Sequence, residues 1–340
     1  MATNWIGIDI GGANLKLATK RECYSVPFEL WKQSENLPAA LKELFAKTEP
    51  FDRIAVTMTG ELADCYESKA EGVASICDAV MNVAADKRPV FYQTTGQFVG
   101  NRQAKSEWQR TAAANWHALA AFVGLQVPNC LVVDIGSTTT DIIPVQNGTP
   151  TTIGNTDLTR LQNSELLYTG VSRTPICAVC KSVQLNGQQT PLAAELFATM
   201  LDVYLLLGKI PTTNDNNHTA DGRAANKPAA RRRIAKMACA DADELDPSMI
   251  LEIVHQVAAE QQRMIGHAVK KVLTRIANIQ HVIVAGEGDW LVKSVLSSSK
   301  EFQNTICSIT DLAGDPTTSK LISSTGPAHA VAQLAQNKLG

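Results

Sequence analysis

The sequence lacks an excess of charge of either sign, which argues against a nucleic-acid-binding protein. Its 31 Lys and Arg residues nearly balance its 33 Asp and Glu residues, so the formal net charge is −2 at pH 7, whereas a domain that binds nucleic acid usually carries a strong basic patch. The sequence also has no long apolar run, and no cationic leader follows Met1. We therefore expect a cytoplasmic protein with neither a nucleic-acid nor a membrane partner.

Paired cysteine motifs are scarce as well. Of the eight cysteines, only Cys177 and Cys180 form a C-x-x-C pair, whereas a structural zinc site usually needs two such pairs or one pair with spaced histidines. We interpret the cysteines as free buried thiols, with redox chemistry at Cys177 and Cys180 as the alternative. No linker or low-complexity tract interrupts the chain, and its 340 residues are enough for two domains that each bury a core.

The stretch from Leu131 to Val145 is the most informative part of the sequence. An apolar run ends at Asp134, a turn with Gly136 and hydroxyl residues follows, and a second apolar run leaves the turn, which predicts a β-hairpin. Asp134 lies beside the turn, where a hydrated Mg²⁺ would fit. The groups that the turn can aim at phosphate oxygens belong to Gly136, Ser137, Thr138 and Thr139.

The same pattern occurs near the N-terminus, where Asp9 ends a strand and a glycine turn follows. Aligning Asp9 with Asp134 offsets the two copies by 125 residues, about the size of one domain. Two similar domains would then face one cleft, where both aspartates hold a single Mg²⁺ and Asp141 orients its water shell. The groups expected to contact phosphate in the first copy belong to Gly11, Gly12, Asn14 and Lys16.

A duplicated Asp-x-Gly hairpin resembles the phosphate loops of the actin, sugar-kinase and Hsp70 superfamily. That superfamily also has a glycine-rich turn after a late strand, which touches the adenosine of a nucleotide, and residues 282–288 resemble this turn. The resemblance implies an α/β fold of duplicated actin-like ATPase (ribonuclease H-like) domains that face a central cleft. We place the first domain at 1–127 and the second at 128–323, with a C-terminal helix at 324–340 that packs back near the first domain.

The strand predicted at 54–58 ends in a turn that carries two acids. Because ligands gather at the carboxyl ends of strands in an α/β sheet, we expect this turn to open on the same cleft as Asp9. Glu61 and Asp64 are therefore candidate site acids. The alternative for each is a solvated turn with an acid that caps a helix.

The second domain contains two candidate anion-binding segments. Arg173 lies in a short, turn-rich stretch, where it is either a bidentate ligand of an anionic substrate group or a surface arginine. Residues 211–226 form a long polar loop of the kind that often serves as a lid or binding loop. Arg231 to Arg233 follow on a helix that is either a solvated basic helix or an anion-binding element.

Apolar residues at helical spacing predict the longer helices. Asp246 and Pro247 form a typical start for one of them, as N-cap and first helical residue. The predicted helices lie at 69–85, at 104–123, from a cap at Thr190 and Pro191 through Leu207, and from Asp246 to about residue 276.

A closer resemblance covers most of the chain. The segments 58–73, 115–120, 173–175 and 219–223 are similar to the hydantoinase/oxoprolinase-related proteins of the tetrahydromethanopterin-linked one-carbon transfer pathway. Archaeal members of that family are condensing enzymes of methanofuran biosynthesis. They join an aminomethylfuran diphosphate to the phenol of γ-glutamyltyramine and release pyrophosphate.

This resemblance implies a transferase whose phosphate loops and Mg²⁺ hold a diphosphate leaving group. Glu61, Asp64 or Lys69 would take the phenol proton, because a phenol with a pKa of about 10 needs a positioned base. Arg173 or Arg223 would receive the glutamyl carboxylate of the acceptor. Such proteins are commonly dimers, so a homodimer is expected. Further residues implied to bind this small phosphorylated substrate are Thr59, Asp221, Gly286, Glu287 and Gly288.

Two other functions stay open. The first is an ATP-dependent small-molecule kinase or a hydantoinase/oxoprolinase-like hydrolase, which Glu287 disfavours because its side chain would crowd a purine ribose. The second is a non-catalytic actin-like nucleotide switch, although the sequence shows no long assembly loops and no peptide-binding appendage. ATP is therefore an alternative ligand, whereas Mg²⁺ is the expected cofactor.

Overall fold

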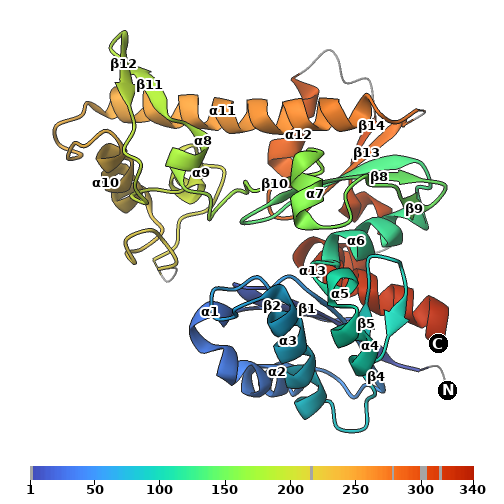
Figure 1. The fold of residues 1–340 in the computed structure, drawn as a ribbon. Helices are drawn as coiled ribbons and strands as arrows, with labels where there is room; N and C mark the ends of the chain where they lie inside the picture. Colours follow the sequence, from blue (N-terminus) through green and yellow to red (C-terminus); the bar gives the residue numbers. More distant parts are fainter. Residues whose placement is uncertain (1–2, 215–216, 278, 299–304, 314–315) are drawn as a thin grey trace.

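The computed structural model describes residues 3–214, 217–277, 279–298, 305–313 and 316–340. Within these ranges the chain forms two large sheets, a two-stranded ribbon, and helices that lie between and around the sheets (Figure 1). Met1 and residues 215 and 216 of the predicted polar loop lie outside the described residues. In the described ranges no helix combines the length and the hydropathy needed to span a bilayer.

The first sheet has β1 at its centre, and its strand order is β3-β2-β1-β4-β5-β6. β1 is antiparallel to β2 and parallel to β4, and all its residues are buried. In the described part of the chain the strands of this sheet are β1 (Trp5–Ile10), β2 (Asn14–Ala18), β3 (Cys23–Pro27), β4 (Arg53–Met58), β5 (Val90–Tyr92) and β6 (Phe98–Val99).

The second sheet repeats the connectivity of the first. Its order is β10-β8-β7-β13-β14, and the central β7 is antiparallel to β8 and parallel to β13, as β1 is to β2 and β4. The predicted α/β fold of duplicated actin-like domains is therefore confirmed. Its strands are β7 (Cys130–Ile135), β8 (Thr140–Gln146), β9 (Thr149–Pro150), which pairs with β8, β10 (Leu166–Leu167), β13 (His281–Ala285) and β14 (Thr305–Ser308).

The two predicted hairpins are both present and share one register. Asp9 lies opposite Lys16 in the ladder of β1 with β2, and Asp134 lies opposite Asp141 in the ladder of β7 with β8. Because side chains alternate between the faces of a strand, an identical register places equivalent residues on equivalent faces. The duplication thus extends from strand order to single residues.

Most predicted helices are present with shifted ends. Asp246 begins the long one as expected, because its carboxylate accepts a hydrogen bond from the Ser248 N–H at 2.8 Å. The described helices are α1 (Leu30–Gln33), η1 (Ser34–Asn36), α2 (Leu37–Phe45), α3 (Lys69–Val83), α4 (Asn101–Ser106), α5 (Trp108–Thr111), α6 (Asn115–Gly124), α7 (Asp157–Gln162), α8 (Ile176–Val179), α9 (Met200–Leu206), α10 (Lys227–Met237), α11 (Pro247–Leu273), α12 (Asp289–Ser297), η2 (Ile309–Leu312) and α13 (Pro316–Leu339).

The prediction of a single helix over 104–123 is wrong. The segment is divided among α4, α5 and α6, and the last break lies where Ala112 is extended and Ala113 has a φ of 46°. A positive φ cannot continue a right-handed helix. The break lets the chain leave the core of the first sheet, which Ala104 joins, and enter the layer between the sheets, which Trp116 joins.

The predicted helix start at Thr190 and Pro191 is also wrong. Both residues belong to β12 (Gln188–Pro191), which pairs with β11 (Ser182–Leu185), and α9 begins later, after Thr199. Asn186 and Gly187 make the turn between the two strands, with φ values of 49° and 77°. An Asn-Gly pair with positive φ at both positions is the preferred two-residue hairpin turn.

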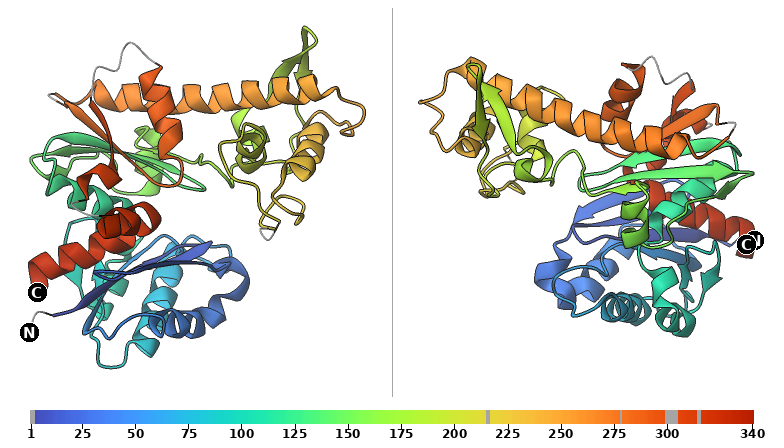
Figure 2. Two further views of the ribbon diagram at one scale, coloured as in Figure 1. Left: turned by 180° about the vertical axis from the view of Figure 1, so that it is seen from behind. Right: turned by 45° about the horizontal axis from the view of Figure 1, so that its top comes forward.

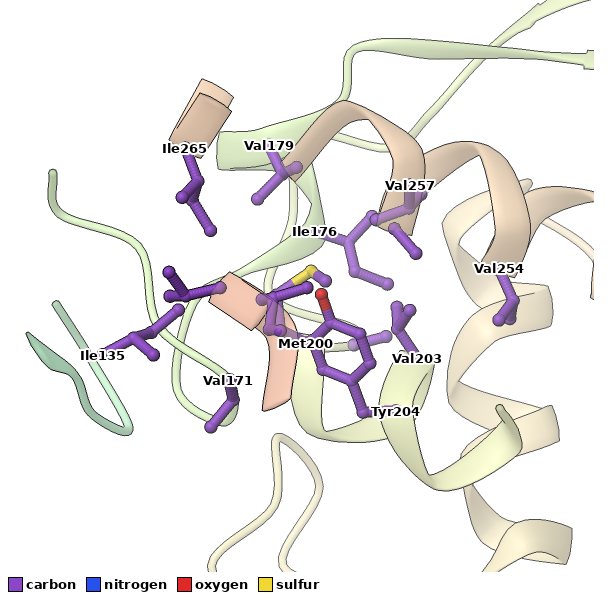
Figure 3. Close-up of a cluster of buried hydrophobic side chains, with 14 of the residues drawn as sticks. Ile135, Val171, Ile176, Val179, Met200, Val203, Tyr204, Val254, Val257 and Ile265 are labelled. Carbon is purple, nitrogen blue, oxygen red and sulfur yellow. The ribbon is translucent and has the colours of Figure 1, made fainter. Parts of the chain in front are cut away.

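Residues 176–214 and 217–246 form a side lobe at the end of α11 that lies away from the second sheet (Figures 1 and 2). Figure 3 shows Met200 and Tyr204 of α9 packed near Val254 of α11. The same buried cluster includes Ile135 and Val171, which adjoin the second hairpin. The side lobe is therefore an extension of the core that supports that hairpin.

One of the three consecutive arginines is part of the side-lobe interior. Arg233 is 1% exposed and pairs with Asp202 at 2.6 Å and with Asp221 at 2.9 Å. A buried arginine needs such partners, because an unpaired charge in the interior is strongly unfavourable. The interpretation of this segment as a solvated basic helix is therefore wrong for Arg233, whose charge holds the lobe together.

α6 and α13 form the layer between the two large sheets (Figure 1). α13 packs against β1, where Gly7 leaves no room for a Cβ because the backbone of Ala328 lies against it. The helix is kinked at Thr325, which has non-helical angles, two residues before Pro327. Proline disrupts the preceding turn because it lacks an N–H and its ring clashes with an earlier carbonyl.

All eight cysteines are free thiols, which agrees with one part of the cysteine interpretation. Their expected burial is wrong in most cases, because only Cys77 and Cys130 are buried. Cys177 and Cys180 are half-buried at α8, and the Cys180 thiol donates to the Ser182 carbonyl at 3.0 Å. The C-x-x-C pair therefore forms one short turn at the root of the side lobe.

Candidate active site

A cleft of about 530 Å³ opens between the two large sheets and is lined by residues of both. The tips of the two hairpins and the turns after β4 and β13 meet there, since all of them follow the carboxyl ends of neighbouring strands. The predicted site residues that line the cleft are Asp9, Gly11, Gly12, Asn14, Lys16, Thr59, Glu61, Asp64, Asp134, Gly136, Ser137, Thr138, Thr139, Asp141, Arg173, Gly286 and Glu287.

The two hairpin tips are tight turns of the same kind. In the first, the Gly11 N–H donates to the Asn14 carbonyl at 3.0 Å, and in the second the Gly136 N–H donates to the Thr139 carbonyl at 3.0 Å. A Cβ added at Gly136 would meet no atom within 4 Å. The backbone there is open to the cleft, so a phosphate can approach it closely.

The aspartates at the hairpin ends carry carboxyl groups with raised pKa values. Asp9 is 5% exposed and its Oδ1 has no hydrogen-bond partner among the described residues. Burial raises the pKa of Asp9 to about 6, although Lys16 opposes the shift. Burial also raises the pKa of Asp134 to about 7, and the carboxyl group of Asp141 adds to that rise. Each pKa would fall if a cation stabilised the ionised form.

This donor set fits a hydrated Mg²⁺. Magnesium prefers oxygen ligands, keeps several waters, and is usually held by one or two carboxylates and substrate phosphates. In the described ranges no three or more Asp, Glu, His or Cys side chains converge as a complete metal cage. Asp9 and Asp134 would therefore contact the ion only through such a sparse, water-rich shell.

Asp141 is engaged by a buried arginine that the sequence did not reveal. Arg160 of α7 is 1% exposed, and its guanidinium pairs with Asp141 at 2.8 Å. The guanidinium carbon also lies 4.0 Å from the centre of the Trp116 ring, an arrangement that stabilises a cation. Burial raises the pKa of Asp141 and Arg160 opposes the rise. The second hairpin thus carries a carboxylate whose charge is largely balanced from within.

Gly286 lies directly against Asp134. Its φ is +85°, and a Cβ at this position would clash with the Asp134 carboxyl group and the Ile135 carbonyl. Only glycine fits such a position. Glu287 follows, exposed on the cleft wall, whereas Gly288 is buried and donates its N–H to the Ile135 carbonyl at 3.0 Å. The first and second residues of the turn face the cleft, and Gly288 supports it from behind.

Glu61 is the most perturbed acid of the turn after β4. It is 1% exposed, and its Oε2 has no hydrogen-bond partner among the described residues. Burial raises the pKa of Glu61 to about 7, with a smaller rise from Asp157 and an opposing effect from Lys69. A cleft carboxyl group that titrates near neutral pH suits a general acid or base. Asp64, by contrast, is exposed on the cleft wall.

Lys69 is paired across the cleft instead of projecting into it. Its Nζ lies 2.7 Å from the carboxylate of Asp157, which is the first residue of α7. α3 belongs to the first half and α7 to the second, so this ion pair joins the two halves beside Glu61. The ion pair directs the Lys69 ammonium to Asp157, and Lys69 is not among the residues that line the cleft. The geometry therefore gives no support to Lys69 as the proton acceptor.

The other predicted residues lie away from the cleft. Asp221 accepts from Arg233 at 2.9 Å within the side lobe, and Arg223 is exposed beside Asp221 at 3.9 Å. Neither of them lines the cleft, and neither do Gly288 and Lys69. A substrate role for Asp221 and Arg223 stays a prediction that the geometry does not support.

Several cleft residues were missed at the sequence level. Asp157, Arg160, Trp116, Tyr168 and Trp31 all line the cleft. Trp116 is a buried core residue that also lines the cleft, and the others lie on short helices or turns without helical periodicity. A half-buried ion pair between α3 and α7, 88 residues apart, leaves no local pattern in the sequence. Of these residues, only Trp116 lies in a segment, 115–120, that carries the family resemblance.

Comparisons with known proteins agree with this fold. The family model described as hydantoinase/oxoprolinase matches residues 52–340. The chain is 32% identical, over 98% of both chains, to the (4-{4-[2-(γ-L-glutamylamino)ethyl]phenoxymethyl}furan-2-yl)methanamine synthase of Methanocaldococcus jannaschii. It is 33% identical to the synthase of the same name from Methanococcus vannielii, over 65% of this chain and 97% of the relative.

A solved structure shares the fold at low sequence identity. The nucleotide-free structure of acetone carboxylase aligns with a TM-score of 0.54 and 10% identity, over 89% of this chain and 68% of that chain. At this identity the likeness concerns the fold alone. Because the family model matches most of the sequence and the M. jannaschii synthase aligns over nearly its whole length, the chain belongs to the hydantoinase/oxoprolinase family, together with these two archaeal synthases.

Proposed function

We propose that this protein is a transferase of methanofuran-type cofactor biosynthesis. It condenses an aminomethylfuran diphosphate with the phenol of a γ-glutamyltyramine-like acceptor and releases pyrophosphate. The observation that carries the proposal is the 32% identity to the M. jannaschii synthase over 98% of both chains. The name of that relative describes a product in which a phenoxymethyl link joins a furan to a phenyl ring with a γ-glutamylaminoethyl group. This link is the ether that such a condensation forms.

The hairpin tips suit the diphosphate leaving group. In the reaction the bond between the furan methylene carbon and the diphosphate oxygen breaks, and a bond between that carbon and the phenol oxygen forms. Negative charge then grows on the diphosphate, where preorganised N–H groups and cations have their largest effect. The open glycine turn at Gly136 and the ammonium of Lys16 are placed to stabilise it. A bound Mg²⁺, held by Asp9 and Asp134, would supply further positive charge at the phosphate oxygens.

Glu61 is the residue placed to take the phenol proton. It lines the cleft, its Oε2 has no partner among the described residues, and burial raises its pKa to about 7. A base with a raised pKa is better matched to a phenol, whose pKa is about 10. Lys69 and Asp157 would act by fixing the charge around Glu61. Asp64, exposed nearby, is the alternative base.

The proposal also covers the compartment, the partners and the oligomeric state. The substrates are small molecules in the cytoplasm, with no role for nucleic acid, and the protein acts as a homodimer.

The alternative function is an ATP-dependent kinase or hydrolase, and one observation favours it: the turn with Gly286 lies against Asp134, as an adenosine-binding turn would. Glu287 lies exposed on the cleft wall beside that turn and would crowd a ribose.

The experiment that separates these functions measures pyrophosphate release with Mg²⁺ and different donors. Release that needs both the furan diphosphate and the phenol is expected, whereas ATP hydrolysis or phosphorylation of the acceptor would replace the proposal with the kinase or hydrolase. Thermal shift provides an independent readout, since a ligand at 100 times its Kd stabilises the fold by about 2.7 kcal/mol. Stabilisation by ATP alone, without stabilisation by the furan diphosphate, would also contradict the proposal.

A further inference from the structure

Equivalent segments of the two halves return to the two hairpin tips. After β3 the chain comes back to the first hairpin, where the Leu30 N–H donates to the Gly12 carbonyl at 2.9 Å. After β10 it comes back to the second hairpin, where the Arg173 N–H donates to the Ser137 carbonyl at 2.8 Å. Trp31 directly follows Leu30, so Trp31 and Arg173 extend from the tips of opposite hairpins.

These two side chains meet across the cleft. The Arg173 guanidinium carbon lies 4.9 Å from the centre of the Trp31 ring, and both residues line the cleft. Arg173 is exposed, and among the described residues its guanidinium forms no ion pair. A cation on an aromatic face is held in place while its N–H groups at the rim remain able to donate. The contact therefore presents an available arginine beside both phosphate-type turns.

The charges of the cleft leave few cations for an anionic ligand. Arg160 is balanced by Asp141 at 2.8 Å, and Lys69 is balanced by Asp157 at 2.7 Å. Lys16 lines the cleft and forms no ion pair among the described residues. Arg173 is the second cleft cation that forms none among them. A diphosphate carries several negative charges, and the planar fork of arginine matches phosphate oxygens in a bidentate manner.

The anchoring of Arg173 decides which end of the substrates it serves. Its backbone is fixed to the second hairpin at Ser137, next to the turn that suits the diphosphate. The carboxylate of the acceptor, in contrast, lies at the opposite end of that molecule from the phenol oxygen, which must reach the carbon that bears the diphosphate. A residue anchored at the hairpin tip is therefore closer to the leaving group than to the acceptor carboxylate.

We propose that Arg173 binds the diphosphate at the open side of the hairpin tips, and that the Trp31 ring holds its guanidinium there. This inference rests on the proposed function for the identity of the ligand, and it assigns Arg173 to the leaving group instead of the glutamyl carboxylate. Trp31 acts as a positioning residue, because it contacts Arg173 and not the reacting atoms.

The test uses inorganic pyrophosphate with Mg²⁺ as the probe, in titration calorimetry of the full chain. Arg173→Ala should weaken pyrophosphate binding by about tenfold or more, Arg173→Lys should retain part of the affinity, and Trp31→Ala should weaken binding by a few-fold. Arg263→Ala is the matched control, since this exposed arginine pairs with Glu260 on α11 and its loss changes the net charge equally. It should leave the affinity unchanged.

An unchanged pyrophosphate Kd in Arg173→Ala would overturn the inference. A raised KM for the phenol acceptor in the same variant would then return Arg173 to the acceptor carboxylate. The inference and the proposed function fail in different ways. If the furan diphosphate is not a substrate but pyrophosphate binding still depends on Arg173, only the function fails. If pyrophosphate is released as proposed and Arg173→Ala binds it normally, only the inference fails.

Discussion

The two halves of the molecule use the same turn for different purposes. In the first half the Gly60 N–H donates to the Ile10 carbonyl, and in the second the Gly288 N–H donates to the Ile135 carbonyl, both at 3.0 Å. An acid follows each glycine. Glu61 is buried in the cleft wall with a raised pKa, whereas Asp289 begins α12 and pairs with Lys293 at 2.9 Å. One backbone site thus gives a candidate base in one half and a helix-stabilising acid in the other.

The hairpins differ in the same way at one pair of equivalent positions. Opposite Asp9 lies Lys16, which forms no ion pair among the described residues, and opposite Asp134 lies Asp141, which Arg160 balances. The first half therefore offers a positive charge to a ligand, and the second offers a preformed, internally balanced carboxylate. The two halves share the same hairpin register, and different residues at equivalent positions make the cleft asymmetric.

The largest effect is expected when Glu61 and its counterpart are changed in parallel. Glu61→Gln should lower turnover by about a hundredfold or more, because general base catalysis contributes on the order of 10²–10⁴-fold. Asp289→Asn is the matched variant at the equivalent position, and it should leave turnover nearly unchanged. Steady-state pyrophosphate release measures both. Equal losses in the two variants would mean that the turns serve the same structural purpose.

The pH profile sharpens this comparison. Glu61 must be ionised to accept a proton, and its pKa is raised to about 7, so the wild-type rate should fall as the pH drops below about 7. The pH dependence near 7 should disappear in Glu61→Gln and persist in Asp289→Asn. If Glu61→Gln showed the same fall in rate below about pH 7, that pH dependence would belong to another group.

Asp134→Asn should reduce turnover by about tenfold or more while the fold stays intact, because it removes a carboxylate that we propose holds the metal. Asp9→Asn, the equivalent change in the first hairpin, should have a loss of similar size if both halves hold one ion. Turnover and circular dichroism are the measurements. Unchanged turnover in Asp134→Asn would remove this residue from the mechanism.

Substitutions of the residues opposite the two aspartates should have different effects, one on ligand binding and the other on the stability of the fold. Lys16→Met should weaken pyrophosphate binding by about tenfold, roughly 1.4 kcal/mol, with little change in the melting temperature. Asp141→Asn should instead destabilise the fold by about 3 kcal/mol, because it leaves Arg160 buried without its partner. Denaturant titration and calorimetry of the two variants test this contrast. A stable Asp141→Asn protein would show that Arg160 does not depend on that pair.

The last effect concerns the pH dependence of stability. The pKa of Glu61 rises from 4.5 to about 7 on folding, so the favourable contribution of the neutral carboxyl group is complete below about 4.5 and is lost as the pH rises through about 7. Glu61→Gln should not show this loss. Its free energy of unfolding, relative to that of the wild type, should therefore rise by up to about 3 kcal/mol from pH 4 to pH 8. Parallel denaturant titrations at both pH values would detect the difference, and a constant difference would contradict the assigned pKa.

The duplicated fold was predictable because its signal is local. Each hairpin combines two apolar runs, an aspartate and a glycine turn within about fifteen residues, and the register follows from that pattern. The break at Ala113 was not predictable in this way, since apolar spacing continued through it while the two sides joined different cores. The Asn186-Gly187 hairpin turn was readable from the sequence and was missed in favour of a proline-capped helix.

The site was most predictable where residues lie at the strand ends and hairpins of the repeat. Asp9, Glu61 and Asp134 lie at strand ends and line the cleft as expected. The charges that tune them come from distant elements: Arg160 reaches Asp141 from α7, and Asp157 pairs with Lys69 from the other half. These contacts cannot be read from the sequence. The family resemblance therefore implied a role for Lys69 that its ion pair does not support.

The measurement that tests the central claim most directly follows the oxygen that joins the furan methylene to the diphosphate. With this bridging oxygen labelled as ¹⁸O, incubation with Mg²⁺ and the phenol acceptor should place the label in the released pyrophosphate and none in the ether product. Mass spectrometry reads both. Label retained in a furan alcohol, together with phosphorylated acceptor or free phosphate, would show cleavage between oxygen and phosphorus and contradict the condensing mechanism.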